Sequence, residues 1–374
     1  MNNSIHHKEP LIHITKRADI DPKLAWTIRI GSIVAALILC AAVTTVATGL
    51  DPISVYGKMF EGAFGSERKI WILGKELAVL LLISLALTPA YKMKFWNLGG
   101  EGQVMIGALA TAACMIYLGK SLPNGILILI MLIAAVAAGA IWAAIPAFFK
   151  ARWNTNETLF TLMMNYVAIQ LVAYYIIVWE VPKGSGKVGI INGDTEAGWL
   201  PVLGGQRYLL TILVAVAFTI FMHIYLTKSK HGYEIAVVGE SPETARYVGI
   251  KVPRVIIRTL LLSGGICGLT GWLMVAGSDH TITTTLAGGR GFLGIMVAWL
   301  AQFNAIAMVA ATLLLVFMSR GAVQISTSFG LNESFGDILT GIILFFIIGS
   351  EFFINYQIHF RNGGKKAKEV KGNV

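Results

Sequence analysis

The chain has 374 residues, of which 56% are hydrophobic and 13% are charged. Soluble domains carry about 25% charged residues, so this composition excludes a soluble enzyme with one anchor. It indicates an all-α protein that crosses a lipid bilayer many times. The formal net charge of +10 is interpreted as basic residues that flank membrane spans, and not as a nucleic-acid surface.

The sequence offers no catalytic chemistry of a familiar kind. Cys40, Cys114 and Cys267 lie in apolar stretches without the spacing of a disulfide framework or a zinc site. Neither HExxH nor the ATP-binding pattern GxxxxGK[ST] occurs. Asp279 and His280 fall in a predicted outer loop, where a lone histidine is expected to be solvated. We therefore expect no catalytic residue, no metal and no cofactor in this chain.

Apolar stretches divide the chain into about ten segments. A span needs roughly 20 mainly apolar residues. The spans are expected, in order, at about 27–48, 70–90, 103–118, 124–149, 156–181, 208–226 and 259–276, then two short pieces around 302–304, and 335–353. A short helix is expected within 49–69, and a polar connection at 319–334.

The distribution of charge predicts how the segments are oriented. Most Lys and Arg residues fall in the tail 1–26, at 91–98, 150–152 and 228–258, and in the basic tail 357–374. By the positive-inside bias these segments are cytoplasmic. Both termini are then cytoplasmic, with the membrane domain at 27–356 between them. The interval 228–258 is polar and carries Lys228, Lys230, Arg246, Lys251, Arg254 and Arg258.

Two glycine motifs resemble each other. Residues 99–102 read GGEG and residues 288–291 read GGRG, and each precedes a short apolar helix. The predicted topology places them on opposite faces of the membrane. This pattern predicts an inverted repeat, and two unrelated turns are the alternative.

Polar side chains within spans are the candidates for a translocation path. Asn97, Glu101 and Gln103 surround the first glycine motif; Glu101 could face a polar substrate, or it could complement a helix dipole. Glu157, Thr161 and Asn165 form one helical stripe, beside a second stripe of Tyr166 and Gln170. The stripes could line a path or hydrogen-bond to other helices. Asn154 and Glu157 also have capping-box spacing.

Residues 241–247, SPETARY, predict a short helix within the basic interval. Ser241 suits the N-cap, Pro242 the first helical position, and Gly249 the end. A helix of this kind could lie among lipid headgroups or dock onto a partner.

The order FWNLGGEGQ, NETLFTLMMNYVA, GESPETARYVGI, LSGGICGLTGWLMVAG and GGRGFLGIMVAWLAQFN resembles the permease subunits of bacterial ABC importers for nucleosides and simple sugars, which are related to branched-chain amino acid and ribose permeases. The resemblance runs from about residue 49 to the last span. It implies a multi-pass protein of the bacterial cytoplasmic (inner) membrane. It also implies a separate ATPase chain that holds ATP and Mg, a second and different permease chain, and an extracytoplasmic substrate-binding lipoprotein.

The resemblance assigns roles to matching positions. The segment 239–250 matches the family's ATPase-coupling segment, with the positions Gly239, Glu240, Ser241, Pro242, Ala245, Arg246, Tyr247 and Gly249. The segments 97–103 and 157–166 match those that border the translocation path. With Phe292 as an additional aromatic, the expected path residues are Asn97, Glu101, Gln103, Glu157, Thr161, Asn165, Tyr166 and Phe292. The family often has an aromatic or small residue where Arg290 stands, so the resemblance gives Arg290 no role in substrate contact.

The expected function is import of nucleosides, purine nucleosides first, with ribose or galactose as the alternative cargo. An ion-driven secondary transporter is a more remote alternative. It requires buried acids for coupling, and acids within the spans are nearly absent from the sequence. An intramembrane enzyme is a third alternative, and it lacks a nucleophile or metal cluster.

Overall fold

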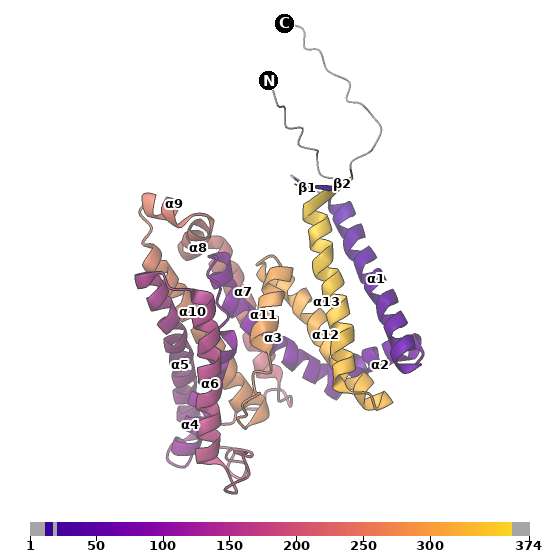
Figure 1. Ribbon diagram of the computed structural model, residues 1–374. Coiled ribbons are helices and arrows are strands. Elements are labelled where there is room, and N and C mark those ends of the chain that lie inside the picture. The colour runs from indigo at the N-terminus through magenta and orange to yellow at the C-terminus, as the bar shows by residue number, and fades with distance from the viewer. Residues whose placement is uncertain (1–11, 18–20, 361–374) are drawn as a thin grey trace, which may run out of the picture. The chain divides into compact units, whose positions relative to one another are not determined.

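Long apolar helices make up most of the chain in the computed structural model, which describes residues 12–17 and 21–360 (Figure 1). Nine helices of this described part are long and apolar enough to cross a membrane, and a shorter apolar helix, α11 (Arg290–Leu300), accompanies them. The expected all-α, multi-pass architecture is confirmed. The contacts divide the chain into a terminal unit, Met1–Gly62 with Gly321–Val374, and a central unit, Ala63–Arg320.

The terminal unit pairs the first and last long helices. Helix α1 (Pro22–Thr48) packs against α13 (Glu333–Asn355), and Arg29 forms a 2.8 Å ion pair with Glu351. Strand β1 (Ile12–Lys16) pairs antiparallel with β2 (Tyr356–Phe360). The described ends of the chain therefore lie together at one end of this helix pair. Their cytoplasmic location stays a prediction.

Helix α2 (Pro52–Phe64) is the short helix expected after the first span. The central unit begins with α3 and ends within α12. In chain order its helices are α3 (Glu67–Lys92), α4 (Gly100–Leu118), α5 (Asn124–Trp153), α6 (Glu157–Trp179), α7 (Leu209–Lys228), α8 (Lys230–Glu240), α9 (Pro242–Tyr247), α10 (Val252–Met274), the π-helical turn η1 (Val275–Asp279), α11 and α12 (Ala305–Phe329).

Helix α10 forms the core of the central unit, packed against α3, α4 and α5. Its glycines let the backbones touch. A Cβ added at Gly264 would overlap the carbonyl oxygen of Gly139 on α5, and one at Gly271 would overlap the carbonyl oxygen of Val104 on α4. Small residues allow this close approach where lipid gives no hydrophobic drive to association. The result is a rigid layer against which the start of α4 is held.

Two boundaries differ from expectation. Helix α12 continues to Phe329, so the predicted polar connection at 319–334 is wrong for most of its length. Its polar side chains are accommodated within the helix, since the Thr327 hydroxyl donates to the Val323 carbonyl at 2.9 Å and a hydroxyl can satisfy itself in this way. Helix α10 begins at Val252, before the expected position 259, because Pro253 fits the first helical turn.

Candidate functional site

The turn between α3 and α4 is held by the side chain of Asn97. Its Oδ1 accepts from the backbone N–H of Gly99 at 3.0 Å and from Nε2 of Gln103 at 3.2 Å. Its Nδ2 donates to the Ser263 hydroxyl of α10 at 3.3 Å. Asn97 and Gln103 are both buried. Asn97 and Gln103, two of the three predicted path residues of this segment, therefore belong to one hydrogen-bonded group.

Helix α6 brings a second pair of polar residues to the same turn. The backbone N–H of Leu98 donates to the Thr161 hydroxyl at 3.0 Å. Asn165 accepts from the N–H of Gly102 at 2.8 Å through Oδ1 and donates to the Leu98 carbonyl at 2.7 Å through Nδ2. Thr161 and Asn165 of the predicted stripe on α6 are thus buried against the 97–103 segment.

Glu101 reaches the second glycine motif. Its Oε1 accepts from the N–H of Gly289 at 2.7 Å, and its Oε2 accepts from the N–H of Gly291 at 2.8 Å. These amides belong to the N-terminal end of α11. A carboxylate there compensates the positive end of that helix dipole. The two glycine motifs are therefore in direct contact, so their predicted placement on opposite faces of the membrane is wrong, because a bilayer core about 30 Å thick would separate them.

Glu157 has a different partner from the one expected. Asn156 is the N-cap of α6, and its side chain accepts from the N–H of Leu159 at 3.2 Å. Asn154 instead ends α5 in the left-handed conformation, so the predicted Asn154–Glu157 capping box is wrong. Glu157 pairs with Lys150 at 2.8 Å, which ties the end of α5 to the start of α6.

Two of the predicted path residues are exposed in this single chain. Tyr166 is 64% exposed and Phe292 is 44% exposed. Each follows in sequence a residue of the buried junction, Asn165 and Gly291 respectively, but its own ring faces outward from this chain. Path lining by any of the eight residues stays a prediction.

Sequence reasoning missed a charged cluster inside the spans. Glu76 of α3 is buried and accepts from Nη2 of Arg290 and, at 2.7 Å, from Nη2 of Arg320. The Nζ atom of Lys75 lies 3.1 Å from Oε1 of Glu76 and 3.6 Å from Oδ1 of Asp279. The expectation that acids are nearly absent from the spans overlooked this group. The adjacent Lys75 and Glu76 in an otherwise apolar stretch were the signal for it.

The predicted coupling helix is present as α9. The Ser241 hydroxyl accepts from the N–H of Thr244 at 3.2 Å, and Pro242 occupies the first turn. Ala245 is buried, whereas Tyr247 is 93% exposed. Beside it, α8 meets the end of α3 so closely that a Cβ at Gly239 would overlap the carbonyl oxygen of Lys92. The helix is thus rigidly mounted and presents its tip outward.

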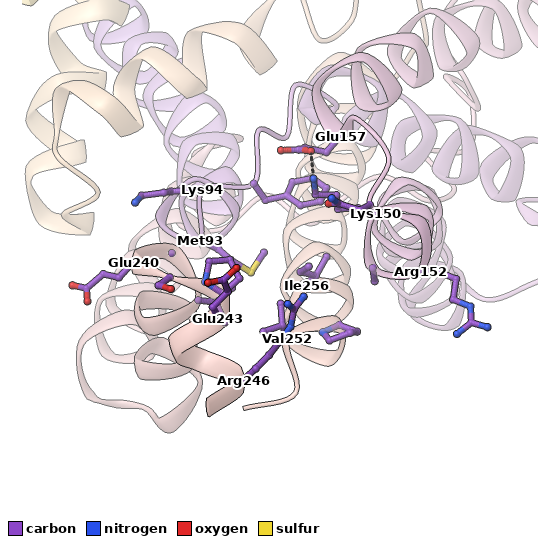
Figure 2. A pocket seen from close by; sticks show the side chains of 18 of the residues that line it. Met93, Lys94, Lys150, Arg152, Glu157, Glu240, Glu243, Arg246, Val252 and Ile256 are labelled. Atoms are coloured by element: carbon purple, nitrogen blue, oxygen red, sulfur yellow. Dashed lines mark ion pairs between the residues drawn. The ribbon is translucent and has the colours of Figure 1, made fainter. Parts of the chain in front are cut away.

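A groove of about 840 Å³ lies next to α9. Figure 2 shows the Lys150–Glu157 pair on one wall and Glu240, Glu243 and Arg246 on another. The turn after α3 and the start of α10 complete its lining. The groove is lined by side chains of both charge signs.

The opposite end of the central unit carries the loop that follows α6 (Figure 1). There His280 is buried, which contradicts the expected solvated histidine. Its ring stacks on Trp199 with centroids 3.8 Å apart, because the loop is drawn in by hydrogen bonds such as Ile191 N–H to the His280 carbonyl at 2.8 Å. Burial, and secondly the positive charge of Arg207, lower the pKa of His280 to about 4.

The fold and this site define a multi-pass helical membrane protein with a buried hydrogen-bonded polar group and a short capped helix whose tip is exposed. The chain belongs to the family described as branched-chain amino acid transport system / permease component, whose sequence pattern matches residues 75–348. Family membership confirms the resemblance found in the sequence.

Named proteins from other organisms are similar to this chain over nearly its whole length. The glucose ABC transporter permease protein TsgB13 of Haloferax volcanii is 30% identical and covers 93% of each chain. The guanosine ABC transporter permease protein NupP of Bacillus subtilis is 29% identical over 91% of this chain and 94% of its own. The nucleoside ABC transporter permease protein NupB of Lactococcus lactis is 26% identical over 90% and 92%. The chain is thus an ABC transporter permease of the nucleoside and sugar type.

Proposed function

We propose that this chain is the membrane permease of an ATP-driven importer that carries nucleosides, purine nucleosides first, across the cytoplasmic membrane. The observation that carries the proposal is α9, a capped helix anchored through buried Ala245 with Tyr247 exposed at its tip. A helix of this kind can transmit motion from a partner because its base is fixed and its tip is free to dock. The guanosine and nucleoside permease relatives support the choice of substrate.

The proposal requires other chains. A separate ATPase that binds ATP and Mg would dock at α9 and the groove beside it, since the sequence lacks the GxxxxGK[ST] loop. A receptor lipoprotein on the outer side would deliver substrate. A second, different permease would complete the membrane part and cover exposed Tyr166.

We propose that the path is bordered by the polar group of α4 and α6. In this conformation Asn97 donates to the Ser263 hydroxyl, Thr161 accepts from the Leu98 N–H, and Asn165 donates to the Leu98 carbonyl. Amides and hydroxyls of this kind can exchange these partners for the hydroxyls and ring nitrogens of a nucleoside. The aromatic rings of Tyr166 and Phe292 would stack on the base. Glu101, Gln103 and Glu157 complete the proposed lining.

A simple sugar is the second candidate substrate, and the glucose permease relative, 30% identical over nearly the full chain, supports it. Both substrates present hydroxyls, but only a nucleoside presents a base that can stack. Competition between the two therefore separates the candidates.

The test is transport by the complete complex. The chain is co-expressed with the ATPase, second permease and receptor that we expect among the neighbouring reading frames, and the complex is reconstituted in proteoliposomes. We expect ATP-dependent uptake of labelled guanosine that excess glucose or ribose does not inhibit. Uptake of glucose but not guanosine would favour the second candidate. Transport by this chain alone, with an ion gradient and no ATP, would contradict an ABC importer.

A further inference from the structure

Two carboxylates from different helices hold the first residues of α11. Glu101 of α4 accepts from the backbone N–H groups of Gly289 and Gly291 at 2.7 and 2.8 Å. Glu76 of α3 accepts from the Arg290 side chain, which lies between those glycines. The backbone and the side chain of one tripeptide are thus fixed separately. We call Glu76, Glu101 and residues 289–291 the α11 clamp.

Helix α11 needs such a clamp because it is short. Its 11 residues span about 16 Å at 1.5 Å per residue, whereas the hydrocarbon layer is about 30 Å thick. One end of α11 therefore lies within the membrane, where free N–H groups at a helix start are costly. Glu101 satisfies two of these groups. The need to satisfy N–H groups at the start of a short membrane helix explains why Glu101 is there. It does not explain why Glu76 is buried beside it.

Glu76 is the centre of an unbalanced charge cluster. Around it lie Lys75, Arg290 and Arg320, with Asp279 as the second acid. Three cations against two carboxylates leave one excess positive charge. Arg290 is also fixed through Nη1, which donates to the carbonyls of Leu286 and Ala287 at 3.2 and 3.3 Å.

The position of this cluster suggests a role in transport. Ionisable groups within membrane spans generally face an aqueous cavity or a partner and mark functional paths. The Arg290 and Arg320 side chains keep 25% and 30% of their surface exposed, so the cluster has an open side. Glu76 also joins three helices, because Arg290 begins α11 and Arg320 belongs to α12.

We propose that Glu76 is a positioning residue for substrate translocation. Through Arg290 it sets the place of the α11 N-terminus against Glu101, and the α11 clamp couples ATP-driven movement to passage of substrate. Loss of the Glu76–Arg290 pair leaves the helices in place but lets the start of α11 shift. ATP is then hydrolysed without a matching import. This inference rests on the proposed importer function.

The experiment uses the complete complex in proteoliposomes and measures uptake and ATP hydrolysis in the same samples. The principal variant is Glu76→Gln with Arg290→Gln, which removes one charge of each sign and so keeps the net charge of the cluster. The matched control is Lys58→Gln with Glu61→Gln, which removes a 2.7 Å ion pair on α2. Arg290→Lys keeps the charge but loses the planar donor pair.

We expect the Glu76/Arg290 double variant to lose at least about tenfold in substrate imported per ATP, which corresponds to about 1.4 kcal/mol of lost coupling. Its assembly and ATPase rate should stay near those of the unaltered complex. The import per ATP of Arg290→Lys should fall between those of the unaltered complex and the double variant. The Lys58/Glu61 control should import normally. A merely structural role would lower assembly, ATPase rate and uptake together, and that result would overturn the proposal.

An unchanged import per ATP in the double variant would also overturn it. If the unaltered complex imports nothing with ATP, the importer function itself fails. If it imports and the double variant does so equally well, only the role of Glu76 fails.

Discussion

The carboxylate of Glu101 accepts from the backbone N–H of Gly291 at 2.8 Å, across 190 residues of sequence. A Cβ at Gly291 would overlap the backbone of Glu101, so the two segments touch directly. The motifs GGEG and GGRG, which the sequence presented as possible repeats, therefore meet in space. Each glycine motif supplies half of one junction between α4 and α11.

Replacement of Glu101 by Gln should weaken this junction. The amide keeps one acceptor oxygen, but its NH2 group would face the second backbone N–H. Hydrogen bonds to charged groups contribute about 1.5–3 kcal/mol, so we expect a loss of that order in stability and a marked loss of uptake. Thermal unfolding of the purified complex in detergent measures the stability, and Glu196→Gln, in the exposed loop that follows α6, is the control. An unchanged unfolding temperature would contradict the assigned bonds.

Helix packing around α10 predicts a strong effect from a single methyl group. Gly264→Ala would place its Cβ on the carbonyl oxygen of Gly139, and overpacking of this kind costs about 1–3 kcal/mol. Gly31→Ala on α1 is the matched control, because nothing lies within 4 Å of its Cβ. We expect Gly264→Ala to lower the unfolding temperature and Gly31→Ala to leave it unchanged or raised. Equal behaviour of the two variants would exclude close α5–α10 packing.

The coupling role proposed for α9 predicts that its alteration removes ATPase contact without loss of the permease fold. Pro242→Ala together with Tyr247→Ala removes the preset first turn and the exposed tip of α9. We expect the ATPase to co-purify poorly, or to hydrolyse ATP without uptake, while the unfolding temperature of the permease is kept. Val202→Ala in the loop at the other end is the control. Transport at the normal rate by the double variant would refute docking at α9.

The buried His280 predicts that stability depends on pH. Its pKa of about 4 in the folded protein lies below the unperturbed value near 6.5. The unfolded chain therefore binds the proton more readily, and the stabilising contribution is complete above about pH 6.5 and lost as the pH falls towards 4. At pH 5 the loss is about 2 kcal/mol. His280→Phe keeps the stack on Trp199 and removes the titration.

Thermal unfolding between pH 7.5 and 5 compares the two proteins. The unaltered chain should lose more stability on acidification than His280→Phe. Parallel curves would show that another group controls any acid sensitivity.

Several features of the site follow from local sequence alone. The Ser241-Pro242 pair predicted α9 because capping and the first turn depend on residues within one turn of the helix. The spacing of Thr161 and Asn165 predicted that they share a face, and both side chains lie inward. The spans were expected near their observed places because hydropathy is a local sum over about 20 residues.

Other features required partners that no local pattern reveals. Glu76 and Arg290 are 214 residues apart, and Glu76 and Arg320 are 244 apart. Polar Arg320 looked like part of a connection because its balancing carboxylate belongs to another helix. His280 looked solvated because the loop that covers it, with Trp199, is distant in sequence.

The sequence by itself determined that the chain is a multi-pass helical membrane protein with a capped short helix at residues 242–247, because hydropathy and helix capping act over one turn to one span. Only the tertiary structure decided that Glu101 caps α11 and that Glu76 binds Arg290. A charge or a free N–H group within the membrane must find its partner through packing, and packing brings together residues from anywhere in the chain.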